Sequence, residues 1–267
     1  IGGNMAYSTI NKHTDYFNTI LWTGNTSTTR SFTGVGFQPD WVWGKQRNTA
    51  RGHQLMDSVR GANKTLESHS TNAEGNQFSN GYLTSFDSDG FSATQGSSAF
   101  VNFNENSGTY AAWNWLAGGT APTITYTVKV VSDSGNKYRF DDFGTSAVTL
   151  DLQEGGTYTF DQSDSSNAGH PLRFSTTANG THGGGSEYTT GVTTTGTPGS
   201  SGAKTVITVA SGAATLYYYC TQHSGMGGQA NTNSTFGSSN FSGSVQSTVS
   251  ANTTAGFSIF KWTGTGS

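Results

Sequence analysis

The sequence predicts an all-β fold, on three observations. Aromatic residues make up 12% of the 267 residues, and they fall in short alternating runs separated by Gly, Asn, Asp and Ser. This is the pattern of many short strands joined by turns. Charged residues are only 11% and hydrophobic residues 32%, a balance that on its own would suggest disorder. A disordered chain, however, would not carry six Trp and sixteen Phe.

Residues 5–120 are predicted to form one β-sandwich module of jelly-roll type. Its clearest strands are Phe17–Thr23, an aromatic strand within Gly36–Lys45, and Thr109–Trp115. Trp41 and Trp43 lie two residues apart and therefore share one face of their strand. The break in the pattern at Gly118–Pro122 marks the expected end of this module.

Two features of this first module have a functional alternative. Asp87-Ser-Asp-Gly90 is predicted to form the turn of a hairpin between two strands. The alternative is that it forms part of a Ca²⁺ site, but the remaining ligands of such a site are missing. Four tryptophans on strands are suited to stacking on sugars, or to building a core or a subunit contact. They are Trp41, Trp43, Trp113 and Trp115.

Residues 123–232 are predicted to form a second sandwich. About seven strands in about 110 residues fit a Greek-key arrangement. The strands are expected at Ile124–Val130, Ala147–Leu152, Gly155–Phe160, His170–Phe174, Lys204–Val209 and Thr215–Cys220. A long Gly/Thr/Ser loop is expected from Thr176 to Gly202, and a Ser/Asn/Gly linker from Asn231 to Ser244.

Residues 233–267 are predicted to hold that linker and one strand of a repeated module. Phe257–Ser267 aligns without gaps on Phe17–Ser27, and the Phe-x4-Trp-Thr-Gly frame is shared. The final strand either begins a second copy of the module or completes the first.

Several classes of function are not expected. The formal net charge is −3 and no basic cluster is present, so a nucleic-acid partner is not predicted. No apolar run approaches the roughly 18–20 residues of a membrane span, and no signal-peptide core opens the chain. No Ser-His-Asp order, paired carboxylates or phosphate loop stands out, so we expect no catalytic residues and no enzyme.

The sharpest chemical signal lies near Cys220, the only cysteine of the chain. Cys220, His223 and Met226 offer a thiolate, an imidazole and a thioether within seven residues, a soft-ligand set suited to copper. His170, in Asn-Ala-Gly-His-Pro, is the leading candidate for a second imidazole. The alternative is a sandwich that binds nothing, in which Cys220 is a buried small hydrophobe and His223 a hydrogen-bonded loop residue.

Residues 124–232 resemble the cupredoxins, the blue-copper fold. Cys220-x2-His223-x2-Met226 follows a strand, as the C-terminal ligand loop of that family does, and Asn167-x2-His170-Pro is similar to the segment of its first histidine ligand. The resemblance implies one type 1-like copper ion held by His170, Cys220 and His223, with Met226 as a weak axial ligand. The His-x2-Met ending is similar to binuclear copper domains, but the second cysteine they need is absent. His182, in the long loop, is either an alternative ligand or solvated.

Residues 5–118 resemble a β-sandwich module of virion structural proteins of tailed bacteriophages, especially those of marine hosts. The residues that carry this resemblance are Tyr16–Thr19, Trp22–Asn25, Gly34–Trp43, Asp57–Ala62, Leu83–Phe91, Tyr110–Trp115 and, at the C-terminal junction, Thr248–Phe257. The resemblance implies a tail fibre, appendage or capsid-decorating protein at the virion surface. The cupredoxin-like block would then be an insertion between two modules.

The partners that follow from this resemblance are a second copy of the chain, other virion proteins and a host-surface glycan or receptor. We expect a homo-oligomer, trimeric if the protein is a fibre, because an uncharged β surface suits assembly through covered strand edges. Two alternatives remain open. One is a blue-copper electron-transfer protein anchored by a β-sandwich, and the other is a carbohydrate-binding adhesin.

Overall fold

The computed structural model describes residues 12–75, 79, 81–95, 103–117, 121–232, 237–252 and 254–264. The described chain is built from strands with a few short 3-10 helices, so the predicted all-β, β-sandwich class is confirmed. It divides into two compact units, residues 1–119 with 250–259 and residues 120–249 with 260–267. Residues 118–120 of the predicted boundary Gly118–Pro122 and the last three residues of the chain lie outside the described residues.

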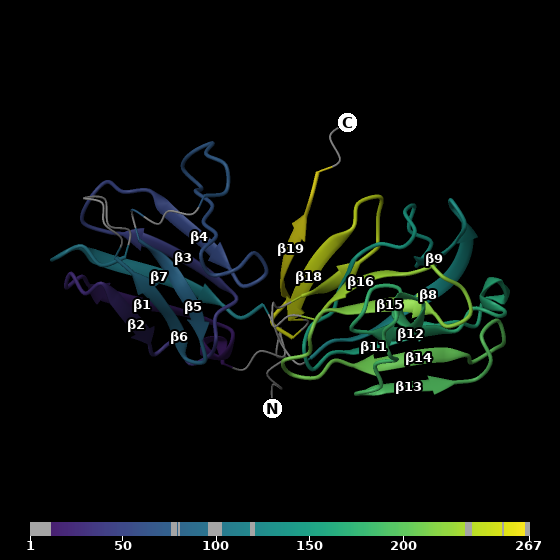
Figure 1. Cartoon of the computed structure of the whole chain (residues 1–267). Coiled ribbons are helices and arrows are strands. Elements are labelled where there is room, and N and C mark those ends of the chain that lie inside the picture. Colours follow the sequence, from purple (N-terminus) through teal and green to yellow (C-terminus); the bar gives the residue numbers. More distant parts are fainter. Residues whose placement is uncertain are drawn as a thin grey trace, which may run out of the picture. The chain divides into compact units, whose positions relative to one another are not determined.

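Unit 1 contains two antiparallel sheets, of strand order β1-β7-β3-β4 and β2-β6-β5 (Figure 1). After the short helix η1 (His13–Asp15), the strands are β1 (Phe17–Thr23), β2 (Thr29–Thr33), β3 (Trp41–Gln46), β4 (His53–Asp57), β5 (Tyr82–Asp87), β6 (Gly90–Thr94) and β7 (Thr109–Trp115). The predicted bounds of β1 and β7 are confirmed to the residue.

The core of unit 1 lies between these two sheets. Each sheet contributes the inward half of its alternating side chains, and the two halves meet in one buried cluster. Trp22 of β1 stacks on Tyr110 of β7, with ring centroids 5.2 Å apart, and its indole also lies 4.5 Å from the ring of Phe32 on β2. Unit 1 is therefore a β-sandwich.

Unit 2 is a second sandwich, with sheets of order β10-β16-β15-β12 and β13-β14-β11-β8-β9. Its strands are β8 (Thr123–Ser132), β9 (Asn136–Phe140), β10 (Leu150–Asp151), β11 (Thr157–Asp161), β12 (Leu172–Ser175), β13 (Val192–Thr195), β14 (Lys204–Thr208), β15 (Leu216–Cys220), β16 (Gly228–Asn231) and β17 (Ser238–Asn240). The strands β18 (Ser247–Asn252) and β19 (Phe257–Trp262) form a small third sheet with β17.

Two segments expected to be irregular contain strands. β13 lies inside the expected loop Thr176–Gly202 and pairs with β14, from Val192↔Ile207 to Thr195↔Lys204. β17 lies inside the expected linker Asn231–Ser244, and its Ser238 is buried against the hydroxyl of Tyr158 at 2.6 Å. Both predictions of irregular structure are wrong at these residues, because main-chain pairing and hydroxyl hydrogen bonds hold strands that have no apolar alternation.

The end of the chain contributes to both units. Phe257 stacks on Trp115, with centroids 6.0 Å apart and an interplanar angle of 15°. Ile259 is buried with Val59 and Ala117, also in unit 1. The residues after Ile259 belong to unit 2. Among the described helices, none has the length and apolar character that a membrane crossing requires.

Candidate metal centre

Cys220 is the last residue of β15, and its position is fixed by the neighbouring strand. β15 runs antiparallel to β12, with Cys220 opposite Leu172. Leu216, Tyr218 and Cys220 alternate along β15 and all three belong to the core cluster of unit 2. The thiol is fully buried, while the loop that follows is exposed. A sulfur atom is therefore presented at the end of a rigid sandwich, directly under a surface loop.

His170 lies in the turn that leads into β12, at the same end of the sandwich. Its backbone N–H donates to the carbonyl of Asn167 at 2.8 Å. Its own carbonyl accepts from Gln162 Nε2 at 2.8 Å and from the Tyr138 hydroxyl at 2.9 Å. Asn167 is itself buried and donates through Nδ2 to the carbonyl of Val128 at 2.7 Å. Asn167, Gln162 and Tyr138, from the sheet β13-β14-β11-β8-β9 and the turns that follow it, thus hold the backbone of His170.

His223 and Met226 follow Cys220 in a tight turn, the ligand loop (residues 221–227). Gly225 has a φ of +74°, in the left-handed region that glycine adopts without strain. A Cβ at Gly227 would lie 1.7 Å from the carbonyl oxygen of Tyr218, so only glycine fits there. Met226 is buried in the same core cluster as Cys220, and its carbonyl accepts from Tyr138 N–H at 3.0 Å.

Side chains from elsewhere in unit 2 form hydrogen bonds with the ligand loop. The side chain of Asn179 donates through Nδ2 to Ser224 Oγ at 2.8 Å, and its Oδ1 accepts from Gly225 N–H at 2.8 Å. The Lys137 ammonium donates to the carbonyl of Gly225. The turn that carries His223 is therefore fixed on both sides by side chains from outside the loop.

The structure brings His170, Cys220 and His223 together. Their ligand atoms all lie within 4.8 Å of one another, and no other group of this kind is found in the described residues. Cys220 Sγ is 3.9 Å from His170 Nδ1 and 3.7 Å from His223 Nδ1. The two imidazole rings have centroids 4.6 Å apart at 45°. These three side chains converge although 50 residues separate His170 from Cys220.

The two nitrogen–sulfur distances of this cluster match those of a trigonal metal site. With bonds of about 2.0 Å to imidazole nitrogen and about 2.3 Å to sulfur, ligands at 120° have an N···S separation of about 3.7 Å. The two observed N···S distances, 3.7 and 3.9 Å, agree with this value. A thiolate with two imidazoles in a plane is the donor set of blue-copper sites, so the residues present fit a copper ion.

The electrostatic environment favours the forms that bind metal. Burial and the neighbouring His223 lower the pKa of His170, so its imidazole is neutral and able to ligate at neutral pH. Burial, with Cys220 beside it, raises the pKa of the Tyr138 hydroxyl far above its ordinary value. Tyr138 therefore remains a hydrogen-bond donor next to the cluster.

His182, the alternative ligand, has a different position. It lies on the short helix η4 (Gly180–Gly183), is exposed, and its Nε2 is 3.0 Å from the backbone carbonyl of Cys220. It is not part of the three-residue cluster. His182 therefore contacts the main chain of a candidate ligand rather than the candidate metal position.

The other candidate functional residues from the sequence, the Asp87–Gly90 segment and the four tryptophans, make hydrogen bonds and ring contacts within unit 1. The carboxylate of Asp89 accepts from Gly36 N–H at 2.6 Å and from Gly34 N–H at 3.0 Å, and these bonds lower its pKa. Asp87–Gly90 is therefore the turn of the β5–β6 hairpin that also caps a neighbouring loop. The four tryptophans pair across strands, Trp41 with Trp115 at 6.4 Å and Trp43 with Trp113 at 5.8 Å, on a half-buried sheet face.

These features define an all-β chain of two sandwich units, with one His–Cys–His cluster among the residues that the structure describes. The chain belongs to the DUF7483 family, a domain of unknown function, whose sequence model matches residues 12–152 and 228–267. No curated protein and no solved structure matches the chain. All four candidate ligands lie in the unmatched stretch 153–227.

Proposed function

We propose that unit 2 binds one copper ion in a type 1-like site. His170 and His223 supply imidazole nitrogens, Cys220 supplies a thiolate, and Met226 is the axial thioether. The observation that carries this proposal is the convergence of two Nδ1 atoms on one buried sulfur at 3.7 and 3.9 Å. A bound copper ion supplies a one-electron redox couple, and the buried thiolate and fixed loops restrict its geometry.

The test is a titration of the purified chain with Cu(II). One equivalent is expected to produce the intense visible absorption of thiolate-to-copper charge transfer and to raise the melting temperature, because the metal binds only the folded state. Cys220→Ser is expected to abolish both effects. His182→Ala is the matched control, since His182 lies beside the cluster without belonging to it. A colourless titration that leaves the melting temperature unchanged would exclude the copper site.

We propose, as the wider role, a structural protein of a tailed-phage virion, at the particle surface, which assembles as a homo-oligomer with other virion proteins. A specific observation supports assembly. β1 is the outermost strand of its sheet, and no strand in the described part of the chain covers its free edge. Leu21 on β1 is 62% exposed. An uncovered edge strand with an exposed apolar side chain is a surface that another chain can extend.

Light scattering during size exclusion tests the assembly proposal. The chain is expected to elute as a trimer or higher oligomer at micromolar concentration, and Leu21→Lys is expected to lower the mass, because it places a charge on the contact edge. Asn63→Lys, which adds the same charge at an exposed loop residue, is the control for altered charge. A stable monomer would contradict the assembly proposal. A copper-binding monomer would instead favour the alternative function, an electron-transfer protein anchored by unit 1.

A further inference from the structure

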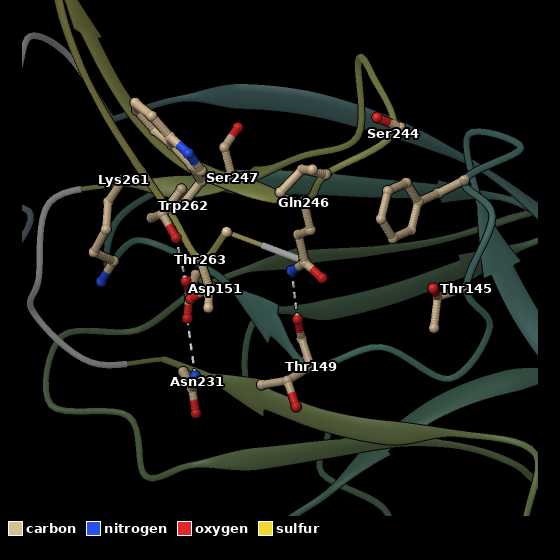
Figure 2. A pocket seen from close by; sticks show the side chains of 14 residues that line it. Thr145, Thr149, Asp151, Asn231, Ser244, Gln246, Ser247, Lys261, Trp262 and Thr263 are labelled. Atoms are coloured by element: carbon tan, nitrogen blue, oxygen red, sulfur yellow. Dashed lines mark hydrogen bonds between the residues drawn. The ribbon is translucent and has the colours of Figure 1, made fainter. Parts of the chain in front are cut away.

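A second site lies in unit 2, on residues that the sequence did not single out. A pocket of about 500 Å³ opens beside the β10–β16 pair (Figure 2). This volume falls in the range of roughly 300–1,000 Å³ that is typical of small-molecule sites. Its lining residues used below are Asp151, Asn231, Gln246, Thr248, Lys261 and Trp262. Every residue that lines the pocket lies in the segments matched by the family.

Asp151 is held in a fixed orientation at the centre of this lining. Its Oδ1 accepts from Asn231 Nδ2 at 2.8 Å, and its Oδ2 accepts from the Thr248 hydroxyl at 2.6 Å (Figure 2). Asn231 is in turn fixed, since its Oδ1 accepts from Gln229 Nε2 at 2.7 Å. Each carboxylate oxygen has two lone pairs, so each retains the capacity to accept one more hydrogen bond. The carboxylate is a preorganised acceptor for two hydroxyl groups.

Gln246 provides a second oriented group. Its Nε2 donates to the carbonyl of Thr149 at 2.7 Å (Figure 2) and also to Ser239 Oγ at 3.1 Å. Since the amide nitrogen of Gln246 donates to both acceptors, the orientation of the planar amide group is fixed. The direction of its oxygen is therefore fixed as well. The pocket therefore combines a carboxylate, a fixed amide and the hydroxyls of neighbouring Ser and Thr residues, which together accept and donate hydrogen bonds.

Trp262 adds an apolar platform to this polar lining. Its side chain lines the pocket and is 65% exposed, the most exposed of the large hydrophobic side chains in the described residues. An indole presents a broad apolar face with a polar N–H at its edge. A sugar ring has the complementary chemistry, with an apolar C–H face on one side and hydroxyl groups around its rim.

We propose that this pocket binds a saccharide, with one neutral pyranose ring seated on Trp262. Two ring hydroxyls donate to the Asp151 carboxylate, and a third donates to the Gln246 amide oxygen. A phosphate or other anion is disfavoured, because the carboxylate of Asp151 offsets the single cation of the lining, Lys261. A purely apolar ligand is disfavoured as well, since it would leave the fixed polar groups desolvated without partners. The site is independent of copper.

Saturation-transfer NMR on the full chain tests this proposal. The probes are the methyl glycosides of glucose, galactose, mannose, fucose and N-acetylglucosamine, each at millimolar concentration. At least one is expected to receive saturation. Trp262→Ala is expected to weaken its binding about tenfold, which corresponds to about 1.4 kcal/mol. Asp151→Asn is expected to weaken it as well, while circular dichroism reports an unchanged fold.

Phe260→Ala is the matched control, because Phe260 is an exposed aromatic residue two positions away that does not line the pocket. It is expected to retain the binding of the wild-type chain. The proposal is overturned if none of the five glycosides receives saturation, or if the Trp262→Ala chain binds as tightly as the wild type. Neither result depends on whether copper binds at Cys220.

Discussion

The two candidate sites of unit 2 differ in which part of the sequence builds them. The metal cluster is formed entirely by residues 153–227, which the family does not match, whereas the saccharide pocket is formed entirely by matched residues. The two parts meet at adjacent strands, since Leu216 and Tyr217 of β15, in the unmatched stretch, pair with Ala230 and Gln229 of the matched β16. One sandwich thus carries a family-matched polar pocket and a soft-ligand cluster that is specific to the unmatched stretch.

The unmatched stretch is nevertheless not a surface appendage. It contains β11 to β15, which supply strands to both sheets of unit 2. Phe160, Phe174 and Tyr218 from this stretch are fully or almost fully buried, in the same cluster as Tyr126 and Phe140 from the matched part. The comparison teaches that the candidate ligands lie in a stretch that also supplies much of the hydrophobic core of unit 2, so the sandwich depends on the same segment that carries the cluster.

The largest effect is expected from removing the stretch. Leu152 and Gly228, the ends of a 153–227 deletion, lie at the end of β10 and the start of β16, which are parallel, so they are rejoined by a Gly/Ser crossover link of about a dozen residues. Five large buried side chains are lost with it, and each contributes roughly 1.5–3 kcal/mol: Tyr158, Phe160, Phe174, Tyr218 and Tyr219. Their sum is comparable to the roughly 5–15 kcal/mol stability of a whole domain.

Unit 2 of the deleted chain is therefore expected to unfold. Hydrogen exchange, read separately for the peptides of each unit, measures this. Rapid exchange of β8 and β9 is the expected result. Full protection of these two strands would show that the matched residues form a complete sandwich without the stretch, and would contradict the shared core.

Acidification is expected to separate the two sites. Copper binds neutral imidazole, so protons compete with the metal. Burial and His223 lower the pKa of His170, which therefore stays neutral below its ordinary value of 6.5 and is protonated only at lower pH. Copper affinity is expected to fall as the pH drops toward 5. The pocket has no histidine among its lining residues, so saccharide binding is expected to change less.

Parallel titrations at a series of pH values, by visible absorption for copper and by saturation transfer for the glycoside, measure this separation. A copper affinity that is the same at pH 5 and pH 7 would contradict ligation through His170 and His223. Buffers without metal affinity are required, and the Cys220→Ser chain gives the background absorption.

Asn179→Gly is expected to weaken copper binding about tenfold, within the range for residues that orient metal ligands. The variant removes both side-chain bonds to the ligand loop, at Ser224 and Gly225. Glycine is the suitable replacement because Asn179 has a φ of +62°, which glycine adopts without strain. Competition with a Cu(I) chelator measures the affinity. An affinity equal to that of the wild type would show that the ligand loop holds its geometry unaided.

The smallest effect is expected from Thr248→Val at the pocket. The change removes the hydroxyl that donates to Asp151 Oδ2 and preserves the shape of the side chain. Loss of about 1 kcal/mol from one such bond corresponds to about fivefold weaker saccharide binding. Copper binding is expected to be unchanged. A coupled loss at both sites would contradict their independence.

The strands that could be predicted from sequence are those with clear alternation. Phe17–Thr23 and Thr109–Trp115 match β1 and β7 because apolar or aromatic side chains recur along each strand. β13 and β17 were not predictable in this way. Thr and Ser dominate both strands, and pairing with β14 and buried serine hydroxyls stabilise them, which leaves no apolar signal in the sequence.

The two candidate sites also differ in how far they could be predicted from the sequence. Cys220, His223 and Met226 lie within seven residues and carry unusual chemistry, so the sequence alone singled them out, and the structure places His170 beside two of them. The pocket has no such signal. Asp151, Asn231 and Trp262 are ordinary residues far apart in the chain, and only the parallel pairing of β10 with β16 and the return of the last strand bring them together.

Copper K-edge X-ray absorption of the copper-loaded chain tests the central claim most directly. The account predicts one short copper–sulfur bond and two copper–imidazole bonds, with the short copper–sulfur bond lost in Cys220→Ser and retained in His182→Ala. A spectrum with only oxygen and nitrogen neighbours in the wild-type chain, or one that is unchanged in Cys220→Ser, would contradict it.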